Sequence, residues 1–188
     1  RVDPKELSAR WYPGAGIYRN VYLTIKNELN IAYQGTFIST PKISKEQAEI
    51  SIQINLENKN NIKGSYTLKT EILDNNEKII AEISQSFNPE ESLQLQDTIL
   101  VKNPALWDLD HPNLYLAKST LLKEGVSIDN SQTIFGIRSI KFSQDNGFEL
   151  NGKQIKFKGV CLHHDLGPLG SAVNYRATQR QLEIMKEI

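Results

Sequence analysis

The sequence has few of the features that would mark a disulfide-stabilised, membrane-spanning or nucleic-acid-binding protein. It contains a single cysteine, Cys161, so an internal disulfide is excluded. Its 22 basic and 22 acidic residues cancel, which leaves no excess charge to attract nucleic acid or an anionic membrane. No apolar run approaches the roughly 18 residues of a membrane helix. We therefore predict neither a nucleic-acid partner nor a membrane partner, and the compartment stays open.

The chain also lacks an initiating methionine and an opening export signal. It stops at Ile188 within a pattern typical of a helix. A chain of 188 residues can bury one substantial core together with pieces of other domains. We therefore expect an internal fragment of a longer protein.

The central part of the chain alternates apolar and polar side chains with a period of two. Between Ala48 and Leu56 every second residue is apolar, which predicts an antiparallel strand with one buried face. Turn residues separate about seven such strands, at 33–39, 48–56, 66–72, 79–87, 93–101, 114–122 and 126–142. Short strands at this spacing, without an intervening helical pattern, predict an all-β fold, an immunoglobulin-like antiparallel β-sandwich.

The segments on either side of the sandwich show different patterns. Residues 17–25 are rich in β-branched and aromatic side chains and predict a strand without local partners. Residues 178–188 have a helical period, with Thr178 and Gln181 spaced as a capping box. Together with a strand at 155–162, this helix would make the first unit of a βα repeat.

A hairpin with a polar end is the most distinctive local feature. Asn151-Gly152, between two apolar-alternating runs, favours a tight turn because both residues must adopt positive φ. The second arm, 155–162, leads into His163, His164 and Asp165 and then a loop at 167–170. In α/β barrels the carboxyl ends of the strands carry the site.

The cluster His163, His164 and Asp165 is open to several interpretations. In a metal site, Cys161, His163 and Asp165 would share one face of an extended segment, but zinc sites normally need three or four ligands and further residues that hold them, and the only other histidine is His111. A Cys161–His163 nucleophilic dyad is disfavoured by the parallel side chains of residues two apart on a strand. The other two interpretations are a solvated strand end and a site for a polyhydroxylated ligand, which imidazoles and a carboxylate can hydrogen-bond.

Three residues near the predicted end of the sandwich have structural interpretations. Trp107 lies in a proline-containing loop rather than in a strand, and we expect it to pack at the end of the sandwich together with Tyr115. Arg138 lies in an apolar run, where it would make an interdomain ion pair or lay its stem along apolar surface.

Four segments resemble, in the same order, segments of glycoside hydrolase family two, the β-galactosidase, β-glucuronidase and β-mannosidase group. They are Gly16-Ile17-Tyr18-Arg19-Asn20-Val21-Tyr22-Leu23, Leu106-Trp107 with His111-Pro112-Asn113-Leu114-Tyr115, Phe135-Gly136-Ile137-Arg138, and Phe148 to Val160 around Asn151-Gly152. The resemblance implies the end of a sugar-binding jelly-roll domain at 1–30. It further implies an immunoglobulin-like sandwich at 31–143 and the start of a catalytic TIM barrel at 144–188.

The resemblance also implies an activity. Members of this family are exo-acting retaining glycosidases with two catalytic glutamates on later barrel strands. Neither glutamate lies within these residues, so we expect no catalytic residue here and a chain that is inactive alone. We expect a terminal β-linked sugar as the substrate of the parent protein, its other domains as partners, and no cofactor or metal.

One site position carries over from the resemblance. His163 is similar to the family's sugar-contacting histidine after the first barrel strand, which makes His163, His164 and Asp165 the predicted substrate-binding residues. Many β-galactosidases have asn-arg-his-glu where this chain has Cys161-Leu162-His163-His164-Asp165. The roles of His164 and Asp165, and the sugar, therefore stay open, although the loop at 167–170 looks more like the galactosidase branch.

The alternative hypothesis is a free-standing immunoglobulin-like module that binds carbohydrate or protein. Limited proteolysis distinguishes the two. A fragment with truncated neighbours should lose both tails and keep about 33–142. Protection of the His163 segment would favour the free-standing module.

Overall fold

The computed structural model describes residues 16–163, 166–172 and 174–188. The chain divides into two compact units, residues 25–156 and residues 1–24 with 157–188, which are described separately. In the first unit seven strands form a sandwich. They are β1 (Leu29–Ile43), β2 (Gln47–Asn58), β3 (Tyr66–Leu73), β4 (Ile79–Phe87), β5 (Gln94–Lys102), β6 (Tyr115–Lys123) and β7 (Val126–Phe135).

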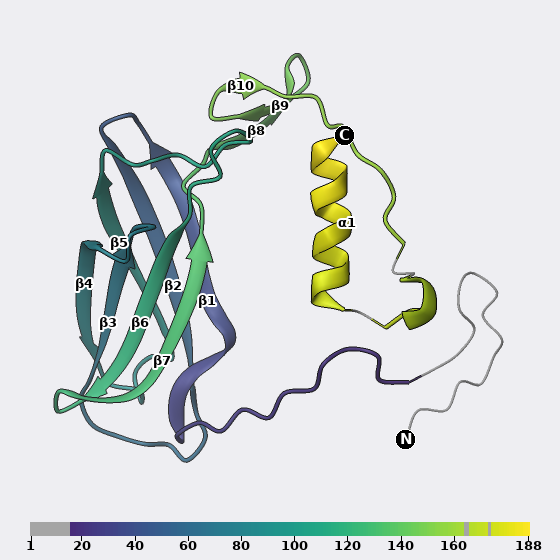
Figure 1. The fold of residues 1–188 in the computed structure, drawn as a ribbon. Coiled ribbons are helices and arrows are strands. Elements are labelled where there is room, and N and C mark those ends of the chain that lie inside the picture. Colours follow the sequence, from purple (N-terminus) through teal and green to yellow (C-terminus); the bar gives the residue numbers. More distant parts are fainter. Residues whose placement is uncertain (1–15, 164–165, 173) are drawn as a thin grey trace. The chain divides into compact units, whose positions relative to one another are not determined.

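The two layers of the sandwich are antiparallel sheets with strand orders β1-β2-β5 and β4-β3-β6-β7 (Figure 1). Both sheets contribute alternate residues to a single core, which includes Ile50 of β2, Ile72 of β3 and Leu121 of β6, each without exposed surface. The immunoglobulin-like antiparallel sandwich predicted from the period-two alternation is confirmed. Within the core, the one buried hydroxyl pair, Thr70 and Ser119, satisfies itself through a hydrogen bond of 3.0 Å.

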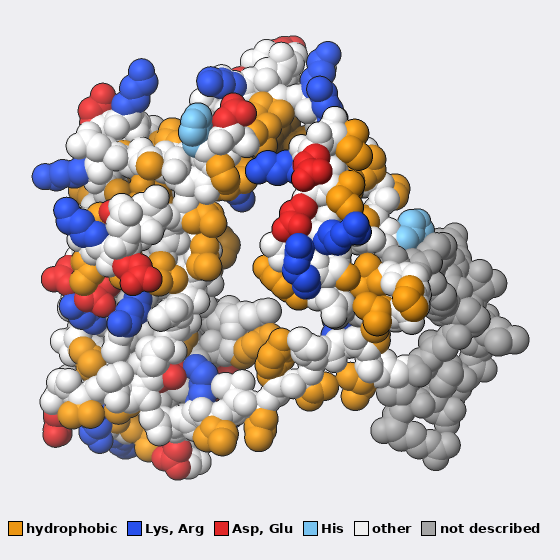
Figure 2. Space-filling model, in the orientation of Figure 1, with side chains coloured by type: hydrophobic (Ala, Val, Ile, Leu, Met, Phe, Trp, Pro, Cys, Tyr) orange, Lys and Arg blue, Asp and Glu red, His pale blue; other side chains and the backbone are white. Residues whose placement is uncertain are grey.

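The surface of the sandwich carries interspersed charges of both signs (Figure 2).

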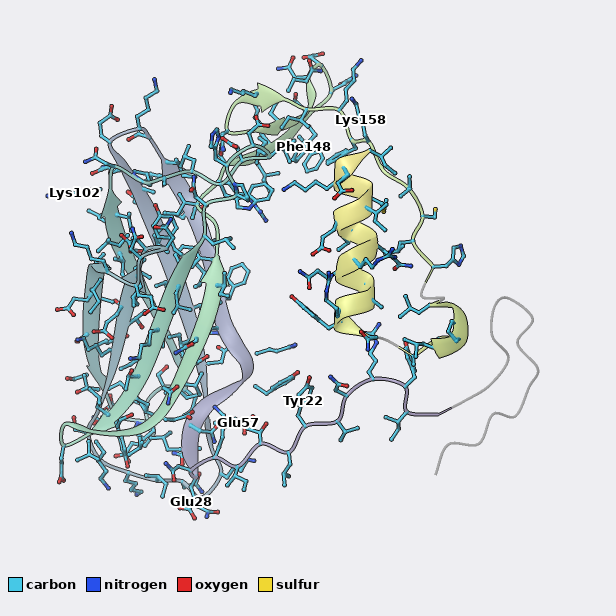
Figure 3. All side chains as sticks on the ribbon, viewed as in Figure 1. Tyr22, Glu28, Glu57, Lys102, Phe148 and Lys158 are labelled. Carbon is cyan, nitrogen blue, oxygen red and sulfur yellow. The ribbon has the colours of Figure 1, made fainter. Side chains whose placement is uncertain are left out.

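The two ends of the sandwich carry different residues. Figure 3 shows Glu28 and Glu57 at one end and Lys102 at the other, nearer a second, smaller sheet. At the Glu28 end, Asp129 of β7 accepts hydrogen bonds from the Ile31 amide and the Lys26 ammonium, at 2.8 and 2.9 Å. These contacts fasten the start of β1 onto β7.

The smaller sheet has the order β10-β9-β8, with β8 (Ile140–Ser143), β9 (Gly147–Leu150) and β10 (Lys153–Gln154). Asn151 and Gly152 join β9 to β10 with φ of 50° and 76°, so the predicted hairpin turn is confirmed. The prediction of one strand over 126–142 was wrong. The chain leaves the sandwich after Phe135 and re-enters a different sheet at Ile140, because the segment between them turns into the contacts described below.

Two strands predicted outside the sandwich are absent from the described residues. Residues 17–25 form no strand, and Leu23 is 90% exposed. A lone strand has no neighbour for its backbone groups, so alternation alone does not produce a sheet. The predicted arm at 155–162 is not a strand either, since pairing ends at Gln154 of β10. The sequence pattern there is that of a strand, but apart from one backbone hydrogen bond from Ile155 to Phe148, no neighbour within the described residues pairs with it.

The predicted helix is confirmed, with an earlier start. Helix α1 (Tyr175–Glu187) is capped by Asn174, whose side chain accepts from the Ala177 amide at 3.1 Å. The capping box predicted at Thr178 and Gln181 was therefore wrong, because Asn174, four residues before Thr178, supplies the capping acceptor. A short 3-10 turn, η1 (Gly167–Leu169), occupies the predicted loop. No helix in the described part of the chain is long and apolar enough to cross a bilayer.

The domain boundaries at 30/31 and 143/144 stay predictions. So does the assignment of the flanking segments to a jelly roll and a barrel.

Candidate functional site

The predicted substrate-binding cluster is only partly within the described residues. His163 lies there, in an exposed segment without regular structure. His164 and Asp165 lie outside the described residues. Cys161, the other member of the metal and nucleophile hypotheses, is a free, exposed cysteine. The cluster as a whole stays a prediction.

A second histidine considered for a metal site is accounted for by local contacts. His111 Nδ1 lies 3.3 Å from Asp108 Oδ1, and the His111 amide donates to the same carboxylate. That amide, more than any other group, lowers the pKa of Asp108. Within the described ranges no three His, Cys, Asp or Glu side chains group closely enough to hold a metal ion.

The structure instead brings together a set of residues from distant parts of the first unit. We call Trp107, Gly136, Arg138, Ser139 and Asn151 the bracket. They come from the loop after β5, the chain between β7 and β8, and the turn of the small sheet. The bracket therefore lies where the sandwich meets the β8–β10 sheet (Figure 1).

Asn151 joins the two sides of the bracket through its side chain. Its amide Nδ2 donates to the Trp107 carbonyl at 3.0 Å, and its Oδ1 accepts from the Ser139 amide at 2.9 Å. The Asn151 backbone amide also donates to the Ser139 carbonyl at 3.0 Å. Asparagine fits here for two reasons, because it tolerates the left-handed φ of 50° and carries both a donor and an acceptor.

Trp107 supplies the packing surface of the bracket. The Arg138 guanidinium carbon lies 4.6 Å from the centre of the Trp107 ring, the geometry of a cation–π contact. A methyl group on Gly136 would lie 2.8 Å from Trp107 Cβ, so only glycine fits there. The Trp107 amide donates to the Ile137 carbonyl at 2.9 Å, and Ile137 has no exposed surface. The segment that leaves β7 thus contacts Trp107 through Gly136, Ile137 and Arg138.

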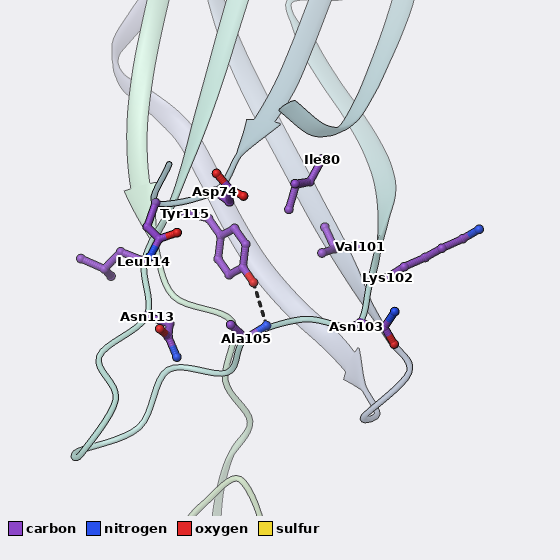
Figure 4. A pocket seen from close by; sticks show the side chains of 10 residues that line it. Asp74, Ile80, Val101, Lys102, Asn103, Ala105, Asn113, Leu114 and Tyr115 are labelled. Carbon is purple, nitrogen blue, oxygen red and sulfur yellow. Dashed lines mark hydrogen bonds between the residues drawn. The ribbon is translucent and has the colours of Figure 1, made fainter. Parts of the chain in front are cut away.

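The packing expected of Trp107 and Tyr115 is confirmed. Tyr115 is 6% exposed, its hydroxyl accepts from the Ala105 amide at 2.8 Å, and burial raises the pKa of that hydroxyl (Figure 4). Arg138 is exposed and its guanidinium covers the Trp107 ring, which agrees with the expectation that its side chain lies along apolar surface. The interdomain ion pair stays a prediction.

Figure 4 also shows a hollow beside Tyr115 at this end of the sandwich. It measures about 230 Å³ and is lined by polar side chains such as Asp74, Lys102 and Asn103. Small-molecule sites usually occupy about 300–1,000 Å³ and are mostly apolar. The hollow is smaller and more polar, so it gives little support to a free-standing binding module.

Sequence reasoning missed the bracket because its members are far apart in the chain. Trp107 and Asn151 are in contact, yet 44 residues separate them. The available signal was the Asn-Gly turn, which we used to place a hairpin without asking where the asparagine amide would hydrogen-bond. The contacts of the bracket are hydrogen bonds and packing, and what they do is to fix one sheet on another.

Comparisons with known proteins give a consistent result. The profile of glycosyl hydrolases family 2 matches residues 33–138, which span most of the sandwich and end at Arg138 of the bracket. A β-galactosidase of Bacteroides ovatus, BoGH2A, is 37% identical over the whole chain, which covers 22% of that protein. A putative β-glucuronidase of Formosa agariphila is 38% identical over the whole chain, which covers 18% of it.

Solved structures give the same result. A glycosyl hydrolase family 2 member from Bacteroides cellulosilyticus superposes with a TM-score of 0.89 and 39% identity, over 95% of this chain and 25% of that one. The β-glucuronidase of Bacteroides uniformis superposes with a TM-score of 0.84 and 29% identity, over 97% of this chain and 23% of that one. The chain thus spans about a fifth to a quarter of the length of these relatives.

Proposed function

The chain belongs to glycosyl hydrolases family 2, and from that premise we propose that it is the non-catalytic linking part of a retaining exo-glycosidase acting on O-glycosidic bonds. In this proposal the sandwich braces a sugar-binding domain against a catalytic barrel. The substrate of the parent protein is a terminal β-linked sugar. The relatives are named as β-galactosidases and β-glucuronidases, so the proposal does not choose between these two sugars.

The proposal rests on which residues match the family profile and on how small a part of the relatives this chain covers. The family profile covers the sandwich, which has a complete core of its own, while the chain covers only 22% and 18% of two glycosidase relatives. Both relatives match the whole chain, and the part that the family profile matches is a body that folds around apolar residues.

The carboxylates of the sandwich also favour a non-catalytic role. A retaining glycosidase needs two carboxyl groups about 5 Å apart beside a sugar-sized pocket, one of them with a raised pKa. Burial raises the pKa of Asp97, but the hollow beside it holds only about 10 Å³, less than a water molecule needs. Asp97 therefore has no sugar-sized pocket beside it, and the two catalytic glutamates are proposed to lie in parts of the parent protein beyond these residues.

The exposed segment before His163 fits the same proposal. Phe157, Val160 and Leu162 are 75%, 70% and 48% exposed, which is unusual for a run of strand-forming residues. They would be buried if this run paired with further barrel strands. In the proposal His163, His164 and Asp165 then line the sugar pocket, as the resemblance of this segment implies.

A turnover assay tests the proposal. The purified 188-residue chain is expected to hydrolyse neither nitrophenyl β-galactoside nor nitrophenyl β-glucuronide above the buffer blank, because in this proposal the acid and the nucleophile belong to other parts of the parent protein. A family 2 β-galactosidase and a family 2 β-glucuronidase, assayed alongside, show that the substrates are competent. Turnover by the chain that is abolished by His163→Ala would contradict the proposal.

A further inference from the structure

The charged side chain of Asp97, on β5, projects toward the core of the sandwich. β5 runs from Gln94 to Lys102 without a bulge, so alternate residues share a face. Leu95 and Ile99, the neighbours of Asp97 on its own face, are 5% and 4% exposed and belong to the core. Asp97 therefore projects inward, directly across from the buried Ile52 of β2.

Almost no polar group lies near the Asp97 carboxylate to hydrogen-bond with it. The small hollow beside it is lined by Ile52, Ile54, Leu68, Thr70, Ile83 and Leu95. The hydroxyl of Thr70, the only polar one of these, is already bonded to Ser119. No hydrogen bond or ion pair joins the Asp97 side chain to any residue in the described ranges, although its backbone pairs with Ile52 of β2. An inward carboxylate in such a position costs stability, and burial accordingly raises its pKa.

The position of β5 in the sheet explains how this carboxylate can be tolerated. β5 pairs only with β2 and forms the edge of its sheet. At an edge, an inward side chain can still reach water around the open side, and Asp97 is in fact only partly buried. A further strand added to β5 would close that route and leave the charge dehydrated.

The composition of β5 makes such an addition a real hazard. Gln94–Lys102 contains no proline, and its only charged residues are Asp97 and the terminal Lys102. Asp97 is followed by Thr98, Ile99, Leu100 and Val101, of which Thr98, Ile99 and Val101 favour strands, and the apolar Leu100 is 53% exposed. A long, weakly charged edge of this kind is a template for pairing with another chain.

We propose that Asp97 is an edge guard: its inward carboxylate keeps the open edge of β5 from pairing with the same edge of a second copy of this chain. Asp97 makes edge pairing unfavourable because pairing would bury its carboxylate without a partner, which costs free energy. The carboxylate lowers the stability of the monomer slightly and lowers the stability of the edge-paired dimer much more. The proposal does not depend on the glycosidase function proposed above.

Replacing the carboxylate with an apolar group of similar size tests this directly. Asp97→Leu should fold, raise the melting temperature by about 2–6 °C, and dimerise at a concentration at least about tenfold lower than the unmodified chain. Sedimentation velocity over a concentration series measures the association. Amide hydrogen exchange should show new protection in β5, which locates the contact at this edge.

Two further variants make the outcome decisive. Asp97→Asn removes the charge but keeps a polar group, so its association should lie between those of the unmodified chain and Asp97→Leu. Thr98→Leu adds the same apolar bulk on the outward face, next to the guard, and should associate like the unmodified chain. The proposal is overturned if Asp97→Leu gains stability but stays as monomeric as the unmodified chain. It is equally overturned if Thr98→Leu associates as strongly as Asp97→Leu, or if Asp97→Leu gains no stability.

Discussion

Replacing Asn151 with alanine is expected to lower the free energy of unfolding of the first unit by about 3 kcal/mol. Two hydrogen bonds are lost, and the Trp107 carbonyl and the Ser139 amide lose the partners they have in the bracket. Each such loss costs about 1 kcal/mol. Alanine must also adopt the left-handed φ of 50°, which costs it roughly 1 kcal/mol more than asparagine. Chemical denaturation followed by tryptophan fluorescence measures the change.

A matched glycine variant separates the two causes. Asn151→Gly loses the same hydrogen bonds but accepts the left-handed backbone without strain. It should therefore be about 1 kcal/mol more stable than Asn151→Ala and still clearly less stable than the unmodified chain. If Asn151→Gly matched the unmodified chain, the side-chain hydrogen bonds of the bracket would contribute nothing and our description of it would be wrong.

Gly136→Ala is expected to cost about 2 kcal/mol for a purely steric reason. Its φ is not in the left-handed region, so alanine meets no backbone strain. The added methyl group would instead lie 2.8 Å from Cβ of Trp107, an atom close to the backbone that cannot swing aside. Either the Trp107 loop or the segment after β7 must shift, and the contact with Arg138 weakens with it. Thermal and chemical unfolding both report this loss.

Gly159→Ala provides the control. Gly159 has no atom of another residue within 4 Å of its added methyl group and no left-handed φ. The same chemical change there should leave unfolding within a few tenths of a kcal/mol of the unmodified chain. Equal losses at the two glycines would show that the close approach at Gly136 has no energetic consequence.

The sequence predicted those parts of the fold that depend on local periodicity. From 48 to 56 the alternation of apolar residues matches β2, and the Asn-Gly dipeptide matches the turn between β9 and β10. Both are determined within a few residues, by side-chain period and by the φ that each residue tolerates.

The errors came where the partner of a segment decides its structure. Residues 17–25 and 155–162 have strand-like sequences. Apart from one backbone hydrogen bond from Ile155 to Phe148, no neighbour within the described residues pairs with them, so they form no strand. The strand predicted to run through 142 breaks after Phe135, because Gly136 and Arg138 pack against Trp107. No local pattern contains a contact between residues so far apart in the chain.

The candidate site shows the same limit. His163, His164 and Asp165 were selected from their chemistry and from a resemblance. Nothing local tells whether they converge on a ligand, and their role stays a prediction. The bracket, by contrast, is visible only in three dimensions, although each of its residues lies in or beside a segment quoted for the family resemblance. Its role in fixing the small sheet follows from the contacts themselves.

The central claim of this account is that the sandwich and the β8–β10 sheet form one folded body, joined by the bracket. Limited proteolysis of the chain, followed by intact-mass analysis, tests it most directly. We predict a resistant product that spans about residues 25–156 and therefore retains the small sheet, and we predict that Asn151→Ala makes this product lose its carboxyl-terminal part. A resistant product from the unmodified chain that ends near Arg138 would contradict the claim, because the small sheet would then be a loose appendage of the sandwich.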